Sequence, residues 1–198
     1  MGKKKTNPNR IPATWSEADK KRAVDEVAQD MILRAWALVL CVLADRWDTT
    51  AESLLSFWDT VNRSCTKLES VDDIEKRLDS LADTIGVRFP FHRIKTDQIR
   101  SKAAVEKAYR KLRQNSLHAM FALIADTVIQ KSLMDHETIC RLFEKVRDMS
   151  LDVERGELSD QDLLGVLEDE FALRLLCRGE RVVLEAISAD MAAPAGSV

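Results

Sequence analysis

The fold of this chain is decided by residues 31–44, which read MILRAWALVLCVLA. Arg34 is the only charged residue in this segment. A helix that spans a bilayer needs about 18–20 consecutive apolar residues, so the segment by itself is too short to cross a membrane. It therefore predicts a helix that is buried in the core of a folded protein.

The composition of the whole chain also favours helices. Its 198 residues include only six glycines and four prolines, and 45% of them are hydrophobic. This length is sufficient for one ordinary domain or two small ones, and the apolar content is sufficient for a packed core. Because strands joined by tight turns need more glycine and proline, we predict an all-α fold.

The chain repeats its own pattern at an offset of 85 residues, which places Trp36 on Phe121, Trp58 on Phe143 and Val61 on Val146. Each half contains a long apolar helix, an aromatic helix, a third helix and then an extended segment with an arginine, at residues 87–89 and 173–175. Helical periodicity alone would match apolar positions by chance, but it would not repeat this order of parts. We interpret the pattern as a tandem duplication of a three-helix unit, with about six to seven helices in one compact body. The two halves would then pack as the subunits of a pseudo-twofold dimer.

Capping signals set the expected helix boundaries. Ser16 is a plausible first cap, residues 49–52 have capping-box spacing, and residues 70–73 and 159–162 repeat that logic. Gly86 is placed to end the third helix. The predicted segments are a flexible basic arm (1–15), a first helical repeat (16–89), a connector (90–95), a second helical repeat (96–176), a C-terminal helix (177–190) and a disordered tail (191–198).

Side chains that commonly carry chemistry are few and scattered. The histidines His92, His118 and His136 are expected to have no cysteine, histidine or carboxylate at metal-ligand spacing on the same face. The acidic loop around Gly156 fails the calcium-loop spacing, because Leu151 would occupy the first ligand position. We therefore expect no catalytic residue, no metal and no cofactor, and we predict that the protein is not an enzyme.

The cysteines indicate a reducing compartment. Cys41, Cys65, Cys140 and Cys177 lie far apart, and no Cys-x-x-Cys motif or secretory signal is present. We expect four reduced thiols in a cytoplasmic protein, with Cys41 buried in its apolar helix. Residues 1–6 formally match an N-myristoylation pattern, but no other feature points to a membrane.

Charge is nearly balanced overall but unevenly distributed. Thirty basic and 33 acidic residues give a formal net charge of −3, which excludes a general attraction to nucleic acid. Residues 93–113, the basic stretch, and residues 152–170, the acidic stretch, predict patches of opposite sign unless the fold brings them together. Candidate partner-binding residues in the acidic stretch are Asp152, Glu154, Glu157, Asp160, Asp162, Glu168 and Asp169. Candidate nucleic-acid-binding residues are Lys3, Lys4, Lys5, Arg10, Arg100, Lys107, Arg110, Lys111 and Arg113.

Two short segments carry a resemblance to a known family. Residues 7–14 read NPNRIPAT and residues 57–62 read FWDTVN. They resemble small, mostly uncharacterised helical accessory proteins that are encoded in phages and integrative elements of Gram-positive bacteria. The resemblance covers the first half of the chain and reaches the second half only through the internal repeat. It implies a bacterial cytoplasmic protein that acts by binding, and it transfers no catalytic residue.

Two hypotheses about function follow. The first is an accessory protein that binds another bacterial protein and inhibits it, with a CRISPR effector or another defence nuclease as the sharpest version (an anti-CRISPR-like protein). The second is a nucleic-acid-binding regulator that uses the basic arm and the basic stretch. A homo-oligomer is compatible with either hypothesis, and neither requires a membrane.

Overall fold

A computed structural model describes residues 17–46, 49–64, 71–93, 102–179 and 181–187 of the chain. These residues form six α-helices and one two-stranded sheet, so the fold is mostly helical. The elements are α1 (Glu17–Arg46), α2 (Ala51–Ser64), α3 (Val71–Ile85), α4 (Lys102–Gln130), α5 (His136–Arg155), α6 (Asp160–Phe171), β1 (Leu173–Arg178) and β2 (Arg181–Ala186).

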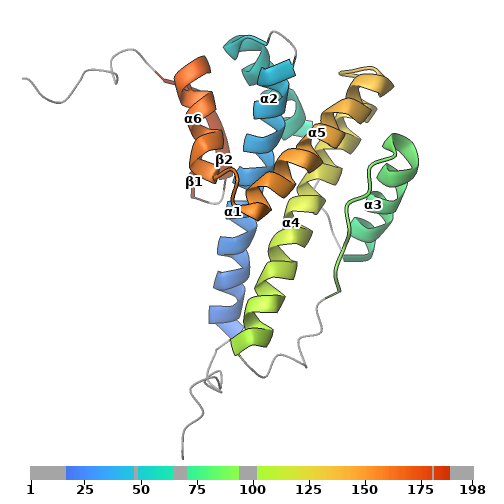
Figure 1. Ribbon diagram of the computed structural model, residues 1–198, viewed down its shortest axis with the longest axis vertical. Helices are drawn as coiled ribbons and strands as arrows, with labels where there is room; N and C mark the ends of the chain where they lie inside the picture. The colour runs from blue at the N-terminus through green and yellow to red at the C-terminus, as the bar shows by residue number, and fades with distance from the viewer. Residues whose placement is uncertain (1–16, 47–48, 65–70, 94–101, 180, 188–198) are drawn as a thin grey trace, which may run out of the picture.

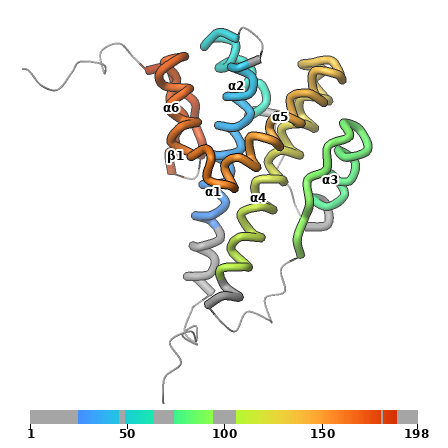
Figure 2. Tube along the Cα trace, in the orientation of Figure 1, coloured from blue at the N-terminus to red at the C-terminus, as the bar shows by residue number. Residues whose placement is uncertain are grey.

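The two long helices form the centre of the molecule. α1 and α4 lie side by side and run in the same direction, so that both begin at the lower end of the view in Figure 1 and Figure 2. α5 and α6 pack on α1, whereas α2 and α3 pack on α4. Each long helix is therefore covered mainly by short helices from the other half of the chain.

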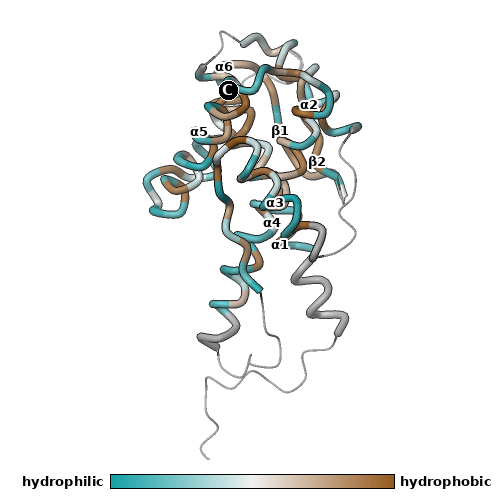
Figure 3. The backbone as a smooth tube through the Cα atoms, turned by 90° about the vertical axis from the view of Figure 1, so that its right-hand side faces the viewer, coloured by the Kyte–Doolittle hydropathy of each residue, from teal (hydrophilic) through white to brown (hydrophobic). Residues whose placement is uncertain are grey.

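The middle of α1 is enclosed on all sides, as its apolar sequence predicts. Every residue from Ala35 to Leu43 is buried, and hydrophobic segments concentrate where the helices and the hairpin pack together (Figure 3). A longer part of α1, Asp25–Asp45, is apolar enough to cross a membrane by length and composition, with a mean hydropathy of 1.8. Because 61% of its apolar window is buried inside the protein, the core accounts for this composition.

Two aromatic pairs join a long helix to the short helix that follows it. Trp36 of α1 lies against Trp58 of α2, with ring centroids 6.2 Å apart. Phe121 of α4 lies against Phe143 of α5, with ring centroids 6.5 Å apart. These are two of the residue pairs that the 85-residue offset aligns, and α4 and α5 also begin 85 residues after α1 and α2.

Local capping explains where several helices begin and end. Thr50 caps α2, since its Oγ1 accepts a hydrogen bond from the Ser53 backbone N–H at 3.2 Å. Asp135 caps α5 through the Thr138 backbone N–H at 2.8 Å. Ser159 caps α6 in a reciprocal capping box, as the sequence predicts. Gly86 follows α3 with φ of 72°, in agreement with its expected role as a helix terminator.

The segment that follows α3 is attached to the core by apolar residues at alternate positions. Val87 and Phe89 are buried, and the Phe89 ring lies 5.3 Å from the Phe121 ring. The backbone at His92 is attached to α4 by two hydrogen bonds with the Asn115 side chain, at 2.9 and 2.8 Å. This segment therefore connects α3 to α4 by side-chain contacts as well as by the covalent backbone.

The predicted all-α character is confirmed in a mostly helical fold, but the prediction of a C-terminal helix over residues 177–190 is wrong where the structure describes this segment. β1 and β2 pair as an antiparallel hairpin in which Leu175 pairs with Leu184 and Arg178 pairs with Arg181. Side chains are buried with a period of two, at Leu173, Leu175, Val182 and Leu184, and Gly179 takes φ of 62° at the turn. One apolar face of a hairpin can cover the end of the core, and a positive φ at this position suits a two-residue turn.

Other predictions concern segments outside the described residues. These are the flexible arm at 1–15, the cap at Ser16, the cap at Ser70, the last two residues of the connector (94–95) and the tail at 191–198.

Candidate functional site

A hollow of about 290 Å³ lies where α1, α4 and α6 meet. Its apolar part comes from Met31, Leu33 and Ala37 of α1 together with Leu164 of α6. Its charged part comes from Asp30 and Arg34 of α1, Arg113 of α4 and Asp160 of α6. Asp30 and Arg113 are exposed, so the charged side of the hollow is open to solvent.

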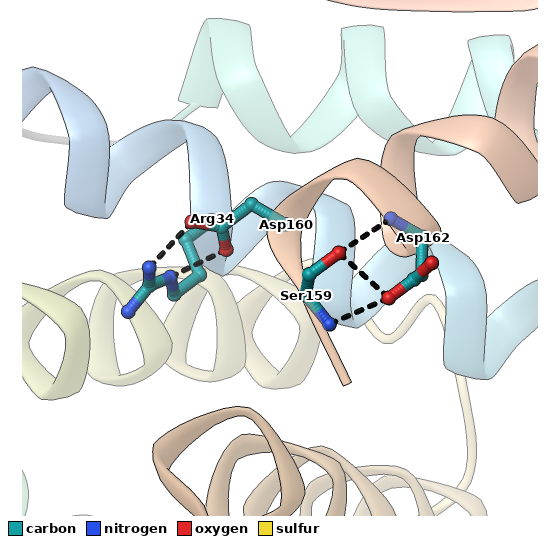
Figure 4. Close-up of polar contacts among 4 residues, drawn as sticks. All are labelled: Arg34, Ser159, Asp160 and Asp162. Atoms are coloured by element: carbon teal, nitrogen blue, oxygen red, sulfur yellow. Dashed lines mark hydrogen bonds and ion pairs between the residues drawn. The ribbon is translucent and has the colours of Figure 1, made fainter. Parts of the chain in front are cut away.

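An ion pair between α1 and α6 forms one wall of this hollow. Arg34 Nε lies 2.6 Å from Asp160 Oδ1, and Arg34 Nη2 lies 2.5 Å from Asp160 Oδ2 (Figure 4). The Arg34 side chain is 23% exposed and the Asp160 side chain is 47% exposed. Two of the guanidinium nitrogens each meet one carboxylate oxygen, which is the bidentate arrangement of a strong arginine–carboxylate pair.

The capping box at the start of α6 places Asp160. Ser159 Oγ accepts a hydrogen bond from the Asp162 backbone N–H at 3.2 Å, and the Ser159 N–H donates to Asp162 Oδ2 at 2.7 Å. Hydrogen bonds from Ser159 lower the pKa of the Asp162 carboxyl group. This local structure fixes the first turn of α6, so Asp160 at its first position is directed toward α1 (Figure 4).

The fold brings the basic and acidic stretches together at this hollow. Asp160 belongs to the acidic stretch and Arg113 to the basic stretch, yet both line the same space. A second contact joins the stretches nearby, where Gln114 Nε2 donates to Glu154 Oε1 at 3.3 Å. The two isolated patches of opposite sign that the sequence suggested are therefore not separate here.

Most candidate residues of the acidic stretch have structural partners. Asp152 lies 3.7 Å from Arg155, and Glu168 accepts a hydrogen bond from Arg174 at 2.9 Å. Asp160 pairs with Arg34, and Asp162 forms the capping box described above. Glu157 and Asp169 are exposed. The acidic stretch is therefore less available to a partner than its composition suggests.

The candidate basic residues are only partly described. Lys107, Arg110 and Arg113 are exposed on the first half of α4, and Lys111 is half-buried. Asp25 and Glu26 are exposed on the adjacent helix α1, and the charge of Glu26 contributes, after burial, to a raised pKa of Tyr109 on α4. Carboxylates thus lie beside the basic stretch. The other candidates, Lys3, Lys4, Lys5, Arg10 and Arg100, lie outside the described residues.

One histidine and one cysteine, His118 and Cys41, are buried in the core. His118 is buried, its Nδ1 lies 2.7 Å from the Pro90 carbonyl oxygen, and burial lowers the pKa of its imidazole. Burial, with a smaller contribution from Glu170, raises the pKa of the Cys41 thiol to about 12. Cys41 is therefore held as a thiol in the core, as expected from its position in α1.

The expectation that His136 has no partner at ligand spacing is wrong. His136 and Cys140 lie one turn apart on the same face of α5, with Cys140 Sγ 3.6 Å from His136 Nδ1. The i, i+4 spacing was visible in the sequence, but only the helical register of α5 makes it meaningful. Within the described part of the chain, no group of three or more histidine, cysteine or carboxylate side chains could hold a metal ion.

Comparison of the chain with known protein families, with curated proteins and with solved structures finds no match.

Proposed function

We propose that this protein acts by binding another protein, and that the hollow between α1, α4 and α6 is part of the binding surface. The observation that carries the proposal is the lining of the hollow, which combines apolar side chains with charges of both signs. Protein interfaces commonly combine a small apolar centre with a polar rim of this kind. An apolar side chain of the partner would pack against the apolar lining, and its charged neighbours would meet Asp30 and Arg113.

The charges of both signs at the hollow also favour a protein over a nucleic acid as the partner. A phosphate backbone is attracted to a continuous cationic surface, and its affinity depends on the number of phosphates that are neutralised. At this hollow a phosphate would meet Asp30 and Asp160 as well as Arg113. The alternative of a nucleic-acid-binding regulator rests on the basic arm and the basic stretch, in which the exposed Lys107 and Arg110 do not line the hollow.

An affinity pull-down of the tagged full chain from a bacterial lysate tests this proposal, with one half of the lysate treated with nuclease. We expect the same protein to be recovered from both halves. The Asp30→Arg variant should lose this protein, whereas a Lys107→Glu/Arg110→Glu variant should retain it. Glu52→Lys, at an exposed position on α2, is the matched control for a change of surface charge.

The opposite pattern would support the alternative function. If recovered DNA or RNA disappears after nuclease treatment, and if Lys107→Glu/Arg110→Glu abolishes recovery while Asp30→Arg does not, the hollow is not the functional surface. Each outcome can be read against Glu52→Lys, which should behave like the unmodified chain.

The resemblance of the first half suggests a narrower partner, and we propose a defence nuclease such as a CRISPR effector. A bacterial inhibitor of this kind would work without chemistry of its own, by covering a surface that the nuclease needs. Nuclease cleavage assays with the purified chain test this version, and the Asp30→Arg variant should lose inhibition. Recovery in the pull-down of a protein that is not a nuclease would reject the proposal of a defence nuclease as the partner. The proposal that the chain acts by binding a protein would still stand.

We also propose that the chain arose by tandem duplication of a three-helix unit. The equivalent aromatic pairs, the common starts of the long and middle helices, and the similar packing of α6 on α1 and of α3 on α4 support this origin. In Figure 1, α6 and α3 lie on opposite sides of the central pair, and α5 lies in front of it while α2 lies behind it. A rotation of half a turn about the long axis would exchange these positions.

A further inference from the structure

We propose that the outer edge of β2 pairs with the same edge of a second copy of this chain, so that the two hairpins form one continuous antiparallel sheet. In the described part of the chain the sheet consists of β1 and β2 alone, so each strand has an edge that no other strand covers. Addition of a strand to such an edge is a common mode of protein association. The proposal goes beyond binding at the hollow, which is lined by residues of α1, α4 and α6.

The register of the hairpin identifies the backbone groups at the edge of β2. The Ile187 N–H donates to the Ala172 carbonyl oxygen at 2.7 Å, which marks one hydrogen-bonded position. Hydrogen-bonded positions alternate along an antiparallel pair, so the backbone groups of Val183 also point toward β1. Those of Val182 and Leu184 point away from β1, and within the described residues they form no hydrogen bond.

The side chains of Val182 and Leu184 are buried, but their backbone groups lie at the edge. Their residues are 9% and 7% exposed and belong to the hydrophobic core. Side chains point out of the plane of a sheet, whereas backbone hydrogen bonds run within it, so burial of the side chains does not close the edge. Backbone polar groups that are buried without a partner are rare, so we infer that water hydrates this edge in a single copy. A second strand would replace that water.

The charges of β2 select one register for this pairing. In an antiparallel pair centred on Val183, Arg181 of each copy lies opposite Glu185 of the other. Opposite charges that face each other across neighbouring strands stabilise a sheet. The same register lets the outward-facing backbone groups of Val182 in each copy exchange hydrogen bonds with those of Leu184 in the other. Charge and backbone geometry therefore agree on one arrangement.

Arg181 gains a carboxylate partner in this arrangement. Its direct neighbour across the hairpin is Arg178, which carries the same charge. Arg178 pairs with Glu185 at 2.6 Å, whereas Arg181 is exposed and forms no ion pair with any residue that the structure describes. The Glu185 side chain is 39% exposed, so a second arginine can approach it. Pairing of two copies would thus relieve the repulsion between the two arginines of each hairpin.

The edge of β1 does not have this complementarity. In an antiparallel self-pair centred on Leu176, Arg174 of each copy would lie opposite Arg178 of the other. Like charges in these positions destabilise a sheet. α6 also packs on β1. The hairpin therefore favours self-association through β2.

Sedimentation velocity of the full chain over a range of concentrations tests the proposal. We expect a reversible equilibrium between monomer and dimer. Arg181→Glu and Glu185→Arg should each weaken self-association by about tenfold or more, because each variant places like charges opposite one another. An equimolar mixture of the two variants should associate again, since their charges are complementary across the interface. Lys145→Glu, at an exposed position on α5, is the matched control and should behave like the unmodified chain.

Amide hydrogen exchange of the unmodified chain, followed by NMR, does not depend on the folding of any variant. The N–H groups of Val182 and Leu184 should exchange more slowly at concentrations where the dimer predominates. The N–H of Val183, which already faces β1, should change little. A chain that stays monomeric at every concentration would overturn the proposal. A dimer in which Val182 and Leu184 exchange as in the monomer, or variants that do not associate when mixed, would also overturn it.

Discussion

Arg34 of α1 and Asp160 of α6 form a two-point ion pair across 126 positions of sequence, with N–O distances of 2.6 and 2.5 Å. This contact fixes the start of a second-half helix on the long helix of the first half. Both side chains also line the hollow between α1, α4 and α6. The pair is therefore both a tertiary contact and a wall of the candidate binding surface.

A double-mutant cycle with Arg34→Ala and Asp160→Ala should give a coupling free energy of about 1 kcal/mol in urea unfolding. The two-point geometry raises this value above that of a simple surface pair, whereas the partial exposure of both side chains limits it. Arg63 and Asp59 on α2 form a more exposed pair and serve as the control, with an expected coupling of about 0.3–0.5 kcal/mol. Equal couplings in the two cycles would show that the α1–α6 contact has no special role.

Ala172→Gly should stabilise the protein by about 1 kcal/mol. Ala172 follows α6 with φ of 50°, a left-handed conformation that glycine adopts without steric cost. Gly86 follows α3 in the corresponding place with φ of 72°, and nothing lies within 4 Å of a Cβ built there. Gly86→Ala should therefore destabilise by a similar amount, through backbone strain alone. Thermal unfolding of both variants checks the two signs, and a stabilising Gly86→Ala would refute the argument.

Phe143→Ala should destabilise the fold by about 3–5 kcal/mol, as expected when a large aromatic residue is removed from a core. Phe143 is fully buried, and its ring meets both Phe89 and Phe121. Leu151→Ala on the same helix is the control, because Leu151 is 40% exposed and should change stability by less than about 0.5 kcal/mol. Similar losses in chemical denaturation would mean that Phe143 is not a core contact.

Stability should fall on acidification in two separate ranges of pH. Burial lowers the pKa of His118 below its ordinary value of 6.5, so the unfolded chain takes up this proton first and stability is lost as pH falls through about 6.5. His118→Gln should flatten the dependence of melting temperature on pH in this range. An unchanged slope in this variant would contradict the assignment to His118.

The second range lies at lower pH and should persist in His118→Gln. Arg93 lowers the pKa of Glu75 below 4.5, and Ser159 lowers the pKa of Asp162 below 3.8. Each of these carboxyl groups has a lower pKa in the folded state than in the unfolded state. The stability that this difference gives is fully present above the unfolded-state pKa and is lost as pH falls through the folded-state pKa. Ser159→Ala should reduce the loss in this lower range only.

The two halves should not fold independently. Residues 1–95 contain α1, whose buried face is covered chiefly by α4, α5 and α6 from residues 96–198. We expect each fragment alone to be unfolded or self-associated, and the two together to form a folded complex by circular dichroism and size-exclusion chromatography. A monomeric, cooperatively folded 1–95 fragment would contradict the conclusion that α1 needs the helices of the second half to cover its apolar residues.

The candidate site could be predicted only in part. The sequence makes both Asp160 and Arg113 candidate binding residues, but on two different surfaces. Their separation in sequence gives no sign that they line one hollow. Asp30 and Arg34 carried no local signal, since a charge on a long helix is usually a solvated position. His136 and Cys140 had the i, i+4 signal, although their approach depends on the rotamers and on the Thr84 carbonyl of another helix.

The sequence by itself determined the helices of this protein and the places where several of them end. Three local features act here: the apolar run at residues 31–44, the capping box at Ser159 and the glycine at position 86. They act through apolar composition, local hydrogen bonds and backbone conformation, which depend on residues close in sequence. The tertiary structure decided what covers each helix. α5 and α6 reach α1, and residues 173–186 form a hairpin, because those arrangements bury apolar faces that local preferences do not place.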